Sequence, residues 1–445
     1  MNQRDAKYTK MTTQPVGRLV WEMAIPSMVC MLVTGLYNVV DTFFVGRIDT
    51  QSTAALGIVF VYMTLIQAIS FFFGHGSGNF ISRALGARQS EQAEEMAASG
   101  FFISIMLTTL LAVSGFIFMD PLLRFFGSTP TILPVARPYF GYILLCSPFM
   151  SGVFVMNNQM RLQGNAILSM VGVLSGAIMN IALDPIFIFG LDMGVAGAGL
   201  ATAISQFVSF WIMLSMIGRN GGIRIRLRHF HPVMAHYREI VAGGLPSLVR
   251  QSLISVVSLC VNNLAATYGD PAVAAFSVVN RVMALVMAAL LGFGQGFQPV
   301  CGFNYGAHLY GRVRKAFNYS VLIATVYCIV VSVIGIVFAE DIICLFRAED
   351  SEVVRIGAQV LRYQCFTFSL VGFVVIVNMY LQNTRKTVSA TVVAIARHGL
   401  FYIPLLYIGS HFWGIYGMVI AQPIADVLSI SMAGVFCAHA LRQMQ

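Results

Sequence analysis

Charged residues are scarce in this sequence. They make up 10% of the 445 residues, whereas about 25% is usual for soluble domains. Hydrophobic residues make up 58%, and the mean hydropathy is +0.78. A soluble fold of this size could not cover its surface with so few charges, which excludes a cytosolic enzyme, a disordered chain and a disulfide scaffold. The composition predicts a polytopic membrane protein.

Motifs for enzyme chemistry are also missing. The eight cysteines fall mostly inside apolar runs and form no CxxC pair, so we interpret them as small buried hydrophobes. The sequence contains no HExxH, no Ser/His/Asp set and no ATP-binding motif. Gly74-x-Gly76-x-Gly78 follows no strand, so it indicates close helix packing and not a dinucleotide site. We therefore predict no enzyme, no cofactor and, if transport is active, an ion gradient as its energy source.

Continuously apolar segments predict an all-α fold, because strands of a membrane barrel would alternate in polarity. We expect twelve transmembrane helices, near residues 19–46, 53–82, 95–118, 137–160, 166–190, 195–218, 240–267, 272–298, 316–339, 357–381, 388–409 and 413–438.

Lysines and arginines predict the orientation. Eighteen lie in the N-terminus, the even-numbered loops and the tail, against about six on the opposite face. The positive-inside rule then places both termini in the cytoplasm, with the protein in the cell inner membrane. The longest basic loop, 219–239, divides the chain into an N-terminal bundle (1–218) and a C-terminal bundle (240–445). We expect its arginines to contact anionic membrane lipids and expect no nucleic acid partner.

The two halves repeat each other at an offset of 220 residues. Pro26-Ser27 matches Pro246-Ser247, and Phe73-Gly74 matches Phe293-Gly294. Between residues 26 and 87 this offset gives 14 identities in 62 positions. Each half has six spans, an even number, so both halves enter the membrane from the same side. We predict two six-helix bundles related by a pseudo-two-fold axis along the membrane normal, an architecture suited to alternating access.

Ionisable residues inside membrane spans are costly and usually functional. Asp41 and Asp184 lie at a similar depth in the outer half of the first bundle, and polar residues share their helical faces: Asn180 four residues before Asp184, and Thr202 on span six. Two carboxylates in a low dielectric cannot both stay ionised without a counter-charge. We predict a shared proton or cation site here; the alternative is that each Asp only bonds polar neighbours.

The second half lacks this set, since the offset places Val261 and Pro404 opposite the two acids. It carries instead Asp426 in span twelve, Arg397 in span eleven and Arg250 in span seven. We predict a buried structural ion pair or triad among these three, with a substrate contact as the alternative.

Several segments resemble the multidrug and toxic compound extrusion (MATE) transporters. They are AIPSMVCMLVTGLYNVVDTFFVGRI in span one, the AALG that follows, the GxGxG…RALGAR end of span two, MNIALDPIFIFG in span five and GVAGAGLATAISQ in span six.

The resemblance implies a V-shaped pair of six-helix bundles that exports amphipathic, often cationic compounds in exchange for protons or sodium ions. The coupling residues, which would also hold a sodium ion, would be Asp41, Asn180, Asp184 and Thr202, and Pro26 would be the bend in span one. Span ten contains no acid, so the chain is similar to the DinF-like branch, which couples through the first bundle.

Alternatives and the substrate remain open at this stage. A lipid-linked oligosaccharide or lipid flippase of the same superfamily is the competing function, although a flippase for pyrophosphate lipids should line its cleft with several cations. The substrate cannot be predicted; candidates for the small-molecule cleft are Tyr37, Gln67, Asn157 and Asn158. We expect a monomer.

Overall fold

The computed structural model describes residues 3–231, 233–347 and 350–443, with only the backbone described for Asn38 and Arg347. Every regular element of these ranges is helical. The α-helices are α1 Gln3–Thr13, α2 Val16–Val45, α3 Thr50–Gly86, α4 Ser90–Ile117, α5 Met119–Phe125, α6 Leu133–Leu162, α7 Ala166–Pro185, α8 Gly194–Met216, α9 Met234–Ala266, α10 Asp270–Gly306, α11 Tyr310–Val337, α12 Ala339–Arg347, α13 Ser351–Asn383, α14 Thr387–Ile395, α15 Ile403–Trp413 and α16 Ile415–Arg442.

The described residues contain twelve helices that are long and apolar enough to cross a membrane, which confirms the predicted number. Local signals fix several of their ends. The Asp49 side chain accepts a hydrogen bond from Ser52 N (2.6 Å) and so caps the start of α3. Asp350 caps α13 in the same way, through Glu352 N and Val353 N. Such polar caps suit the membrane surface, where the chain leaves the lipid.

Two of the spans contain a wider helical turn near their middle or end. The π-helical turn η1 (Ile186–Gly190) directly follows α7, and η4 (Ala396–Tyr402) joins α14 to α15. Such turns often occur at functional sites, because the extra residue re-aims neighbouring side chains. Here η1 begins two residues after Asp184, and η4 carries Arg397.

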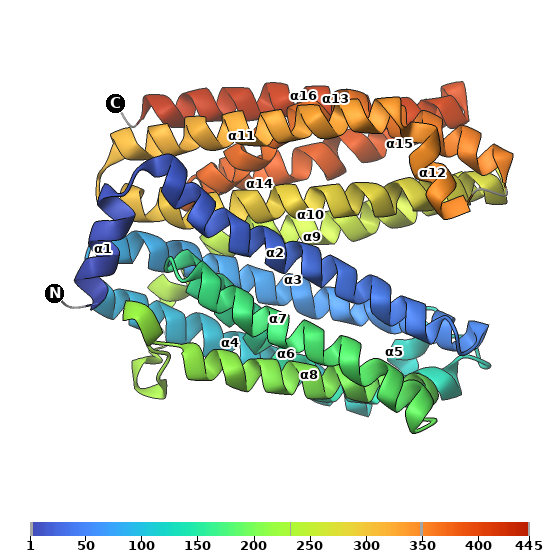
Figure 1. The fold of residues 1–445 in the computed structure, drawn as a ribbon, viewed down its shortest axis with the longest axis horizontal. Helices are drawn as coiled ribbons and strands as arrows, with labels where there is room; N and C mark the ends of the chain where they lie inside the picture. The colour runs from blue at the N-terminus through green and yellow to red at the C-terminus, as the bar shows by residue number, and fades with distance from the viewer. Residues whose placement is uncertain (1–2, 232, 348–349, 444–445) are drawn as a thin grey trace.

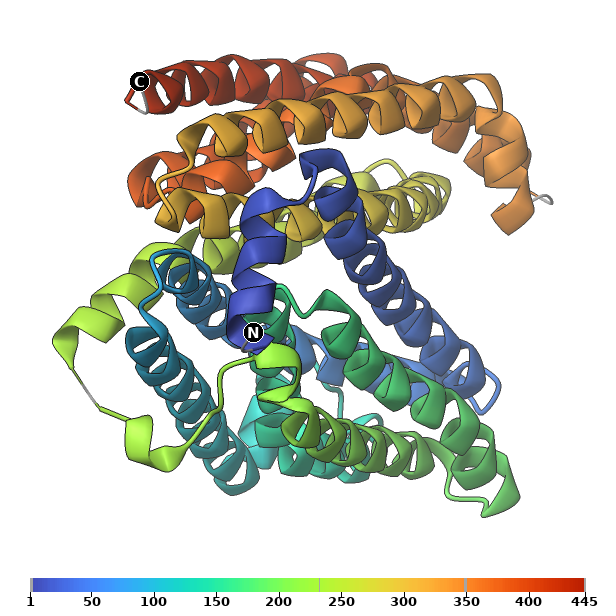
Figure 2. The same cartoon turned by 60° about the vertical axis from the view of Figure 1, so that its left-hand side comes forward.

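The helices form two bundles that lie side by side (Figure 1). Helices α2–α8 make up one bundle and α9–α16 the other, and both chain termini lie at the same end of the molecule. We call this the termini end. Figure 2 shows α1 crossing this end toward the linker that joins the bundles.

The bundles touch through glycines of the repeated motif. A Cβ added at Gly76 of α3 would lie 2.3 Å from Ile240 O of α9, and one at Gly296 of α10 would lie 2.2 Å from Ala24 Cα of α2. No side chain fits at such distances, so glycine allows the helices of the two bundles to approach closely. This confirms the packing role predicted for the motif. Both approaches lie in the half of the molecule toward the termini end.

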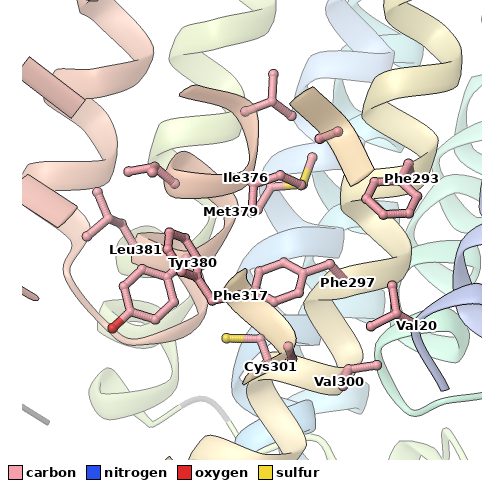
Figure 3. Packing of buried hydrophobic residues seen from close by; sticks show 14 of the residues in the cluster. Val20, Phe293, Phe297, Val300, Cys301, Phe317, Ile376, Met379, Tyr380 and Leu381 are labelled. Atoms are coloured by element: carbon pink, nitrogen blue, oxygen red, sulfur yellow. The ribbon is translucent and has the colours of Figure 1, made fainter. Parts of the chain in front are cut away.

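The first turns of α2 pack against the C-terminal bundle rather than their own. Val20 lies in one buried cluster with Phe293, Phe297 and Val300 of α10, as Figure 3 shows. Trp21 Nε1 adds a hydrogen bond to the Tyr319 hydroxyl of α11 (3.0 Å). The start of α2 is thus held by one bundle and its remainder belongs to the other.

Candidate functional site

The acids predicted to couple ions lie within the N-terminal bundle. Asp41 is on α2, Asp184 with Asn180 is on α7, and Thr202 is on α8. Asn180 Nδ2 lies 3.2 Å from Thr202 Oγ1 and 3.5 Å from Asp184 Oδ1, so one amide joins two helices. Asp41 lies close enough to Asp184 to interact with its charge. All four predicted residues therefore form one polar group.

The two acids of this group are deeply buried and have no cationic partner. Asp41 is 5% exposed and Asp184 is 0% exposed. Within the described ranges neither forms an ion pair, and one oxygen of each, Asp41 Oδ1 and Asp184 Oδ2, has no hydrogen-bond donor. A buried carboxylate without a partner costs several kcal/mol or takes up a proton. The arrangement thus favours a site that binds a proton or a cation.

Oxygen atoms of this group suit a hard cation as well as a proton. Asn180 Oδ1 is also buried without a hydrogen-bond partner, like Asp41 Oδ1 and Asp184 Oδ2. Carboxylate, amide and hydroxyl oxygens are the ligands that hard cations prefer. The described residues contain no group of three or more His, Cys, Asp or Glu arranged for a metal, so a transition-metal site has no support there.

Two tyrosines complete the surroundings of the acids. Tyr37 lies one turn before Asp41 on α2 and approaches Thr202 and Asp184. Tyr139 of α6 is fully buried and lies near both acids. Sequence reasoning missed Tyr139, because a tyrosine near the start of a span is typical of the membrane interface and carries no signal of burial.

A small cavity lies inside the same bundle, and Tyr37 is the residue that it shares with the surroundings of the acids. It measures about 60 Å³, and its lining includes Tyr37, Gln67 and the apolar Met63 and Phe154. This volume holds about two water molecules. Drug-sized ligands occupy pockets of about 300–1,000 Å³, so the cavity is too small for one in this conformation.

Two other residues predicted for the cleft lie elsewhere. Asn157 Nδ2 lies 3.4 Å from Ser169 O, and Asn158 Nδ2 donates to Phe154 O (2.8 Å). Neither residue lines the small cavity, whose lining includes Tyr37 and Gln67. The Asn157 amide instead bonds α6 to α7, and the Asn158 amide bonds the preceding turn of α6.

Pro26 lies inside α2, which continues through it as a helix. It is buried where α2 passes closest to the other bundle, between Ala24 and Met28, which face Gly296 and Gly292. Proline removes one backbone hydrogen bond from a helix and weakens it at that turn. Pro26, at which α2 could bend, therefore lies at the junction of the two bundles.

The acid of the C-terminal bundle has a different environment. Arg397 Nε lies 2.7 Å from Asp426 Oδ1, and their side chains are 13% and 3% exposed. Gln422 Nε2 (2.9 Å) and Thr367 Oγ1 (3.1 Å) also donate to this carboxylate. Arg250, the third member of the predicted triad, forms no ion pair within the described ranges, but lies near His75 and His398. The exposed Arg281 has no acidic partner there either.

Arg161 is one of the eighteen basic residues on the predicted cytoplasmic face, but its side chain is buried. It is 1% exposed, at the end of α6 between the bundles. Its Nη1 donates to Gln295 O (2.7 Å) and Gln298 Oε1 (3.2 Å) of α10, and Nη2 donates to Asn158 Oδ1 (2.5 Å). No acid pairs with it among the described residues. Its polar partners come from both bundles, so it links them at the termini end.

Comparison with known proteins agrees with this architecture. A model of the MatE family matches residues 26–186 and again residues 246–408. Over 430 residues the chain is 27% identical to the multidrug export protein MepA of Staphylococcus haemolyticus (strain JCSC1435), covering 96% of this chain and 94% of that protein.

Solved structures show the same fold. The chain is similar to a crystal structure of MATE in complex with MaL6, with a TM-score of 0.92 and 25% identity over 98% of both chains. It is also similar to an outward-facing conformation of a multidrug resistance MATE family transporter of the MOP superfamily, with a TM-score of 0.91 and 25% identity over 98% of both chains.

The family model and the relatives show a membrane transporter and not an enzyme. The chain belongs to the MatE family, the multidrug and toxic compound extrusion transporters.

Proposed function

We propose that this protein is a secondary antiporter of the cell inner membrane, with both termini in the cytoplasm. It exports amphipathic, cationic compounds in exchange for protons or sodium ions by alternating access, and it acts as a monomer. The relatives named as multidrug export proteins support the class of substrate. The pair of buried, unpartnered acids, Asp41 and Asp184, is the observation that carries the ion coupling.

The contacts between the bundles support the transport cycle. The close approaches at Gly76 and Gly296 lie toward the termini end. With the termini in the cytoplasm, this conformation is closed to the cytoplasm. A proton or sodium ion at Asp41 and Asp184 neutralises charge near Tyr37, which lines the small cavity. Bending of α2 at Pro26 then repacks this cavity and releases the substrate outward.

Transport in proteoliposomes tests the coupling. Export of a fluorescent cationic dye is measured under a proton gradient and under a sodium gradient, applied separately. We expect Asp41→Asn and Asp184→Asn each to abolish ion-driven export, because an amide cannot exchange a proton and binds a cation weakly. Asp120→Asn is the matched control, since this acid lies outside the spans and pairs with Arg137 at the surface.

The outcome separates the competing assignments. Loss of export in both site variants but not in the control supports coupling through the N-terminal bundle. Normal export by both Asn variants under the same gradients would leave these acids with a structural role only. Translocation of a lipid-linked oligosaccharide without dye export would favour the flippase instead.

A further inference from the structure

A second cavity lies at the termini end, away from the acids. It measures about 720 Å³ and is lined by residues of α1, the start of α2, the turn between α6 and α7 and the start of α7. None of its lining residues belongs to the group around Asp41 and Asp184. Its size falls within the range of ligand pockets.

Polar residues line part of this cavity, and they include Lys7 of α1, which forms no ion pair among the described residues. The Nζ atom of Lys7, on α1, is buried and has no hydrogen-bond partner, although the side chain as a whole is only half-buried. Glu22, the acid of the cavity, is already paired with Lys10 (2.7 Å) and Arg18 (3.2 Å). Lys7 is therefore left without an acid. Burial, with a smaller contribution from Arg4, lowers the pKa of Lys7 to about 7.

The protein compensates this cation only in part. Lys7 Cε lies 3.5 Å from the position of a Cβ at Gly164, just past the end of α6. Helix carbonyls at such an end carry a partial negative charge, which favours a lysine. None of them accepts a hydrogen bond from Lys7 Nζ. The amides of Asn165 and Asn220 line the same cavity and add polar groups that could hold a headgroup.

Another part of the cavity lining is apolar. Ile25 of α2 is 55% exposed and Ile167 of α7 is 60% exposed, and Trp21 and Leu168 lie beside them in the lining. Both exposed isoleucines belong to membrane-spanning helices, so their exposed surfaces face lipid chains. A ligand that fills the whole cavity needs an anionic head and an apolar tail.

We propose that this cavity binds an anionic phospholipid, with its phosphate at Lys7 and an acyl chain along Ile25 and Ile167. Basic pockets between helices at the cytoplasmic surface bind lipid headgroups in other membrane proteins. Pro26 lines the same cavity, so the lipid lies between α2 and α7 at the proline turn. A soluble phosphate compound would use only the polar part.

Lipid binding by the purified full chain tests the site. Native mass spectrometry measures bound phosphatidylglycerol against phosphatidylcholine for the wild type, Lys7→Met and Lys7→Arg. Because one basic residue near a membrane contributes about 1 kcal/mol, we expect Lys7→Met to weaken phosphatidylglycerol binding about fivefold. Lys7→Arg should keep the preference. Lys315→Met is the matched control, since this exposed residue lies at the same end outside the cavity.

A second variant keeps the test decisive if Lys7→Met folds poorly. Ile167→Gln leaves Lys7 intact and should also weaken lipid binding, because it places a polar group where the acyl chain lies. Equal loss in the Lys315→Met control would show general surface attraction and overturn the site. Unchanged binding in Lys7→Met would overturn it too, as would displacement of the lipid by glycerol 3-phosphate at equal concentration. Lipid retention is measured without transport, so the result is independent of the proposed export.

Discussion

Neutralising an acid should have opposite effects in the two bundles. Asp426 accepts three hydrogen bonds, one of them from the partly buried Arg397. Replacing Asp426 by Asn keeps the shape but leaves a guanidinium that is 13% exposed without its counter-charge. Breaking a buried ion pair by removing one partner costs about 3–5 kcal/mol, so we expect Asp426→Asn to lower the free energy of unfolding by that amount.

The double variant Arg397→Met/Asp426→Asn isolates the ion pair. The methionine removes the stranded charge. The asparagine oxygen still accepts a bond from Gln422, and its amide Nδ2 can donate to the Thr367 hydroxyl, which then acts as the acceptor. Its cost should be smaller than that of Asp426→Asn alone, with a coupling energy of about 2 kcal/mol or more between the two positions.

Asp184 provides the contrast. It is buried without a cationic partner, and its one hydrogen bond, from Asn180, is long at 3.5 Å. Asp184→Asn removes the cost of burying a charge, so we expect a change within about 1 kcal/mol, or a gain in stability. Unfolding of each purified variant by sodium dodecyl sulfate in mixed micelles measures these values. A loss at Asp184 as large as that at Asp426 would refute the reasoning, because it would require a stabilising partner that the described residues do not show.

Two further predictions concern topology and closure. In a chain whose native cysteines are replaced, Asp192→Cys should react with an impermeant maleimide from outside. Arg226→Cys should react only after permeabilisation. The reverse pattern would show that the predicted orientation in the membrane is wrong. Gly76→Val should prevent contact between the bundles at the termini end, because its first added carbon would lie 2.3 Å from Ile240 O. Spin-label distances between α2 and α10 should lengthen for Gly76→Val. They should not lengthen for Gly57→Val, the control, because no atom lies within 4 Å of an added Cβ there. Equal distances in the two variants would count against a closed termini end.

Much of the fold could be predicted from the sequence because the membrane imposes length and polarity on each helix. Each of the twelve spans overlaps its predicted segment, and their ends differ from the predicted ones by at most eight residues. Helix α1 was missed, since its polar sequence gives no apolar run. Its ordering depends on tertiary contacts that no local pattern shows: Met11 is 1% exposed and lies in the core cluster of the C-terminal bundle.

The sequence indicates the charged residues of the candidate site more clearly than the neutral ones: it predicts Asn180 and Thr202 beside the acids but not Tyr139. An acid inside an apolar run stands out, so Asp41, Asp184 and Asp426 were all found. Asn157 and Asn158 were placed in the cleft on polarity alone, yet an amide serves equally well as a bond between helices. Whether a neutral polar residue lines a cavity depends on how helices rotate against each other, which the sequence does not specify.

Arg161 shows that a basic residue near the end of a span can be buried between helices and not exposed in a loop. Near the end of a span it was counted among the basic residues of the cytoplasmic face, although it is 1% exposed. The second bundle covers it, and this contact joins helices far apart in the chain. Because its guanidinium bonds Asn158 on its own bundle and Gln295 on the other, these bonds exist together only while the bundles touch. Separation at the termini end must break the bonds to α10 and expose the charge to water, which would solvate it. The contact that closes the termini end therefore buries the Arg161 charge, and opening of this end would expose that charge to water.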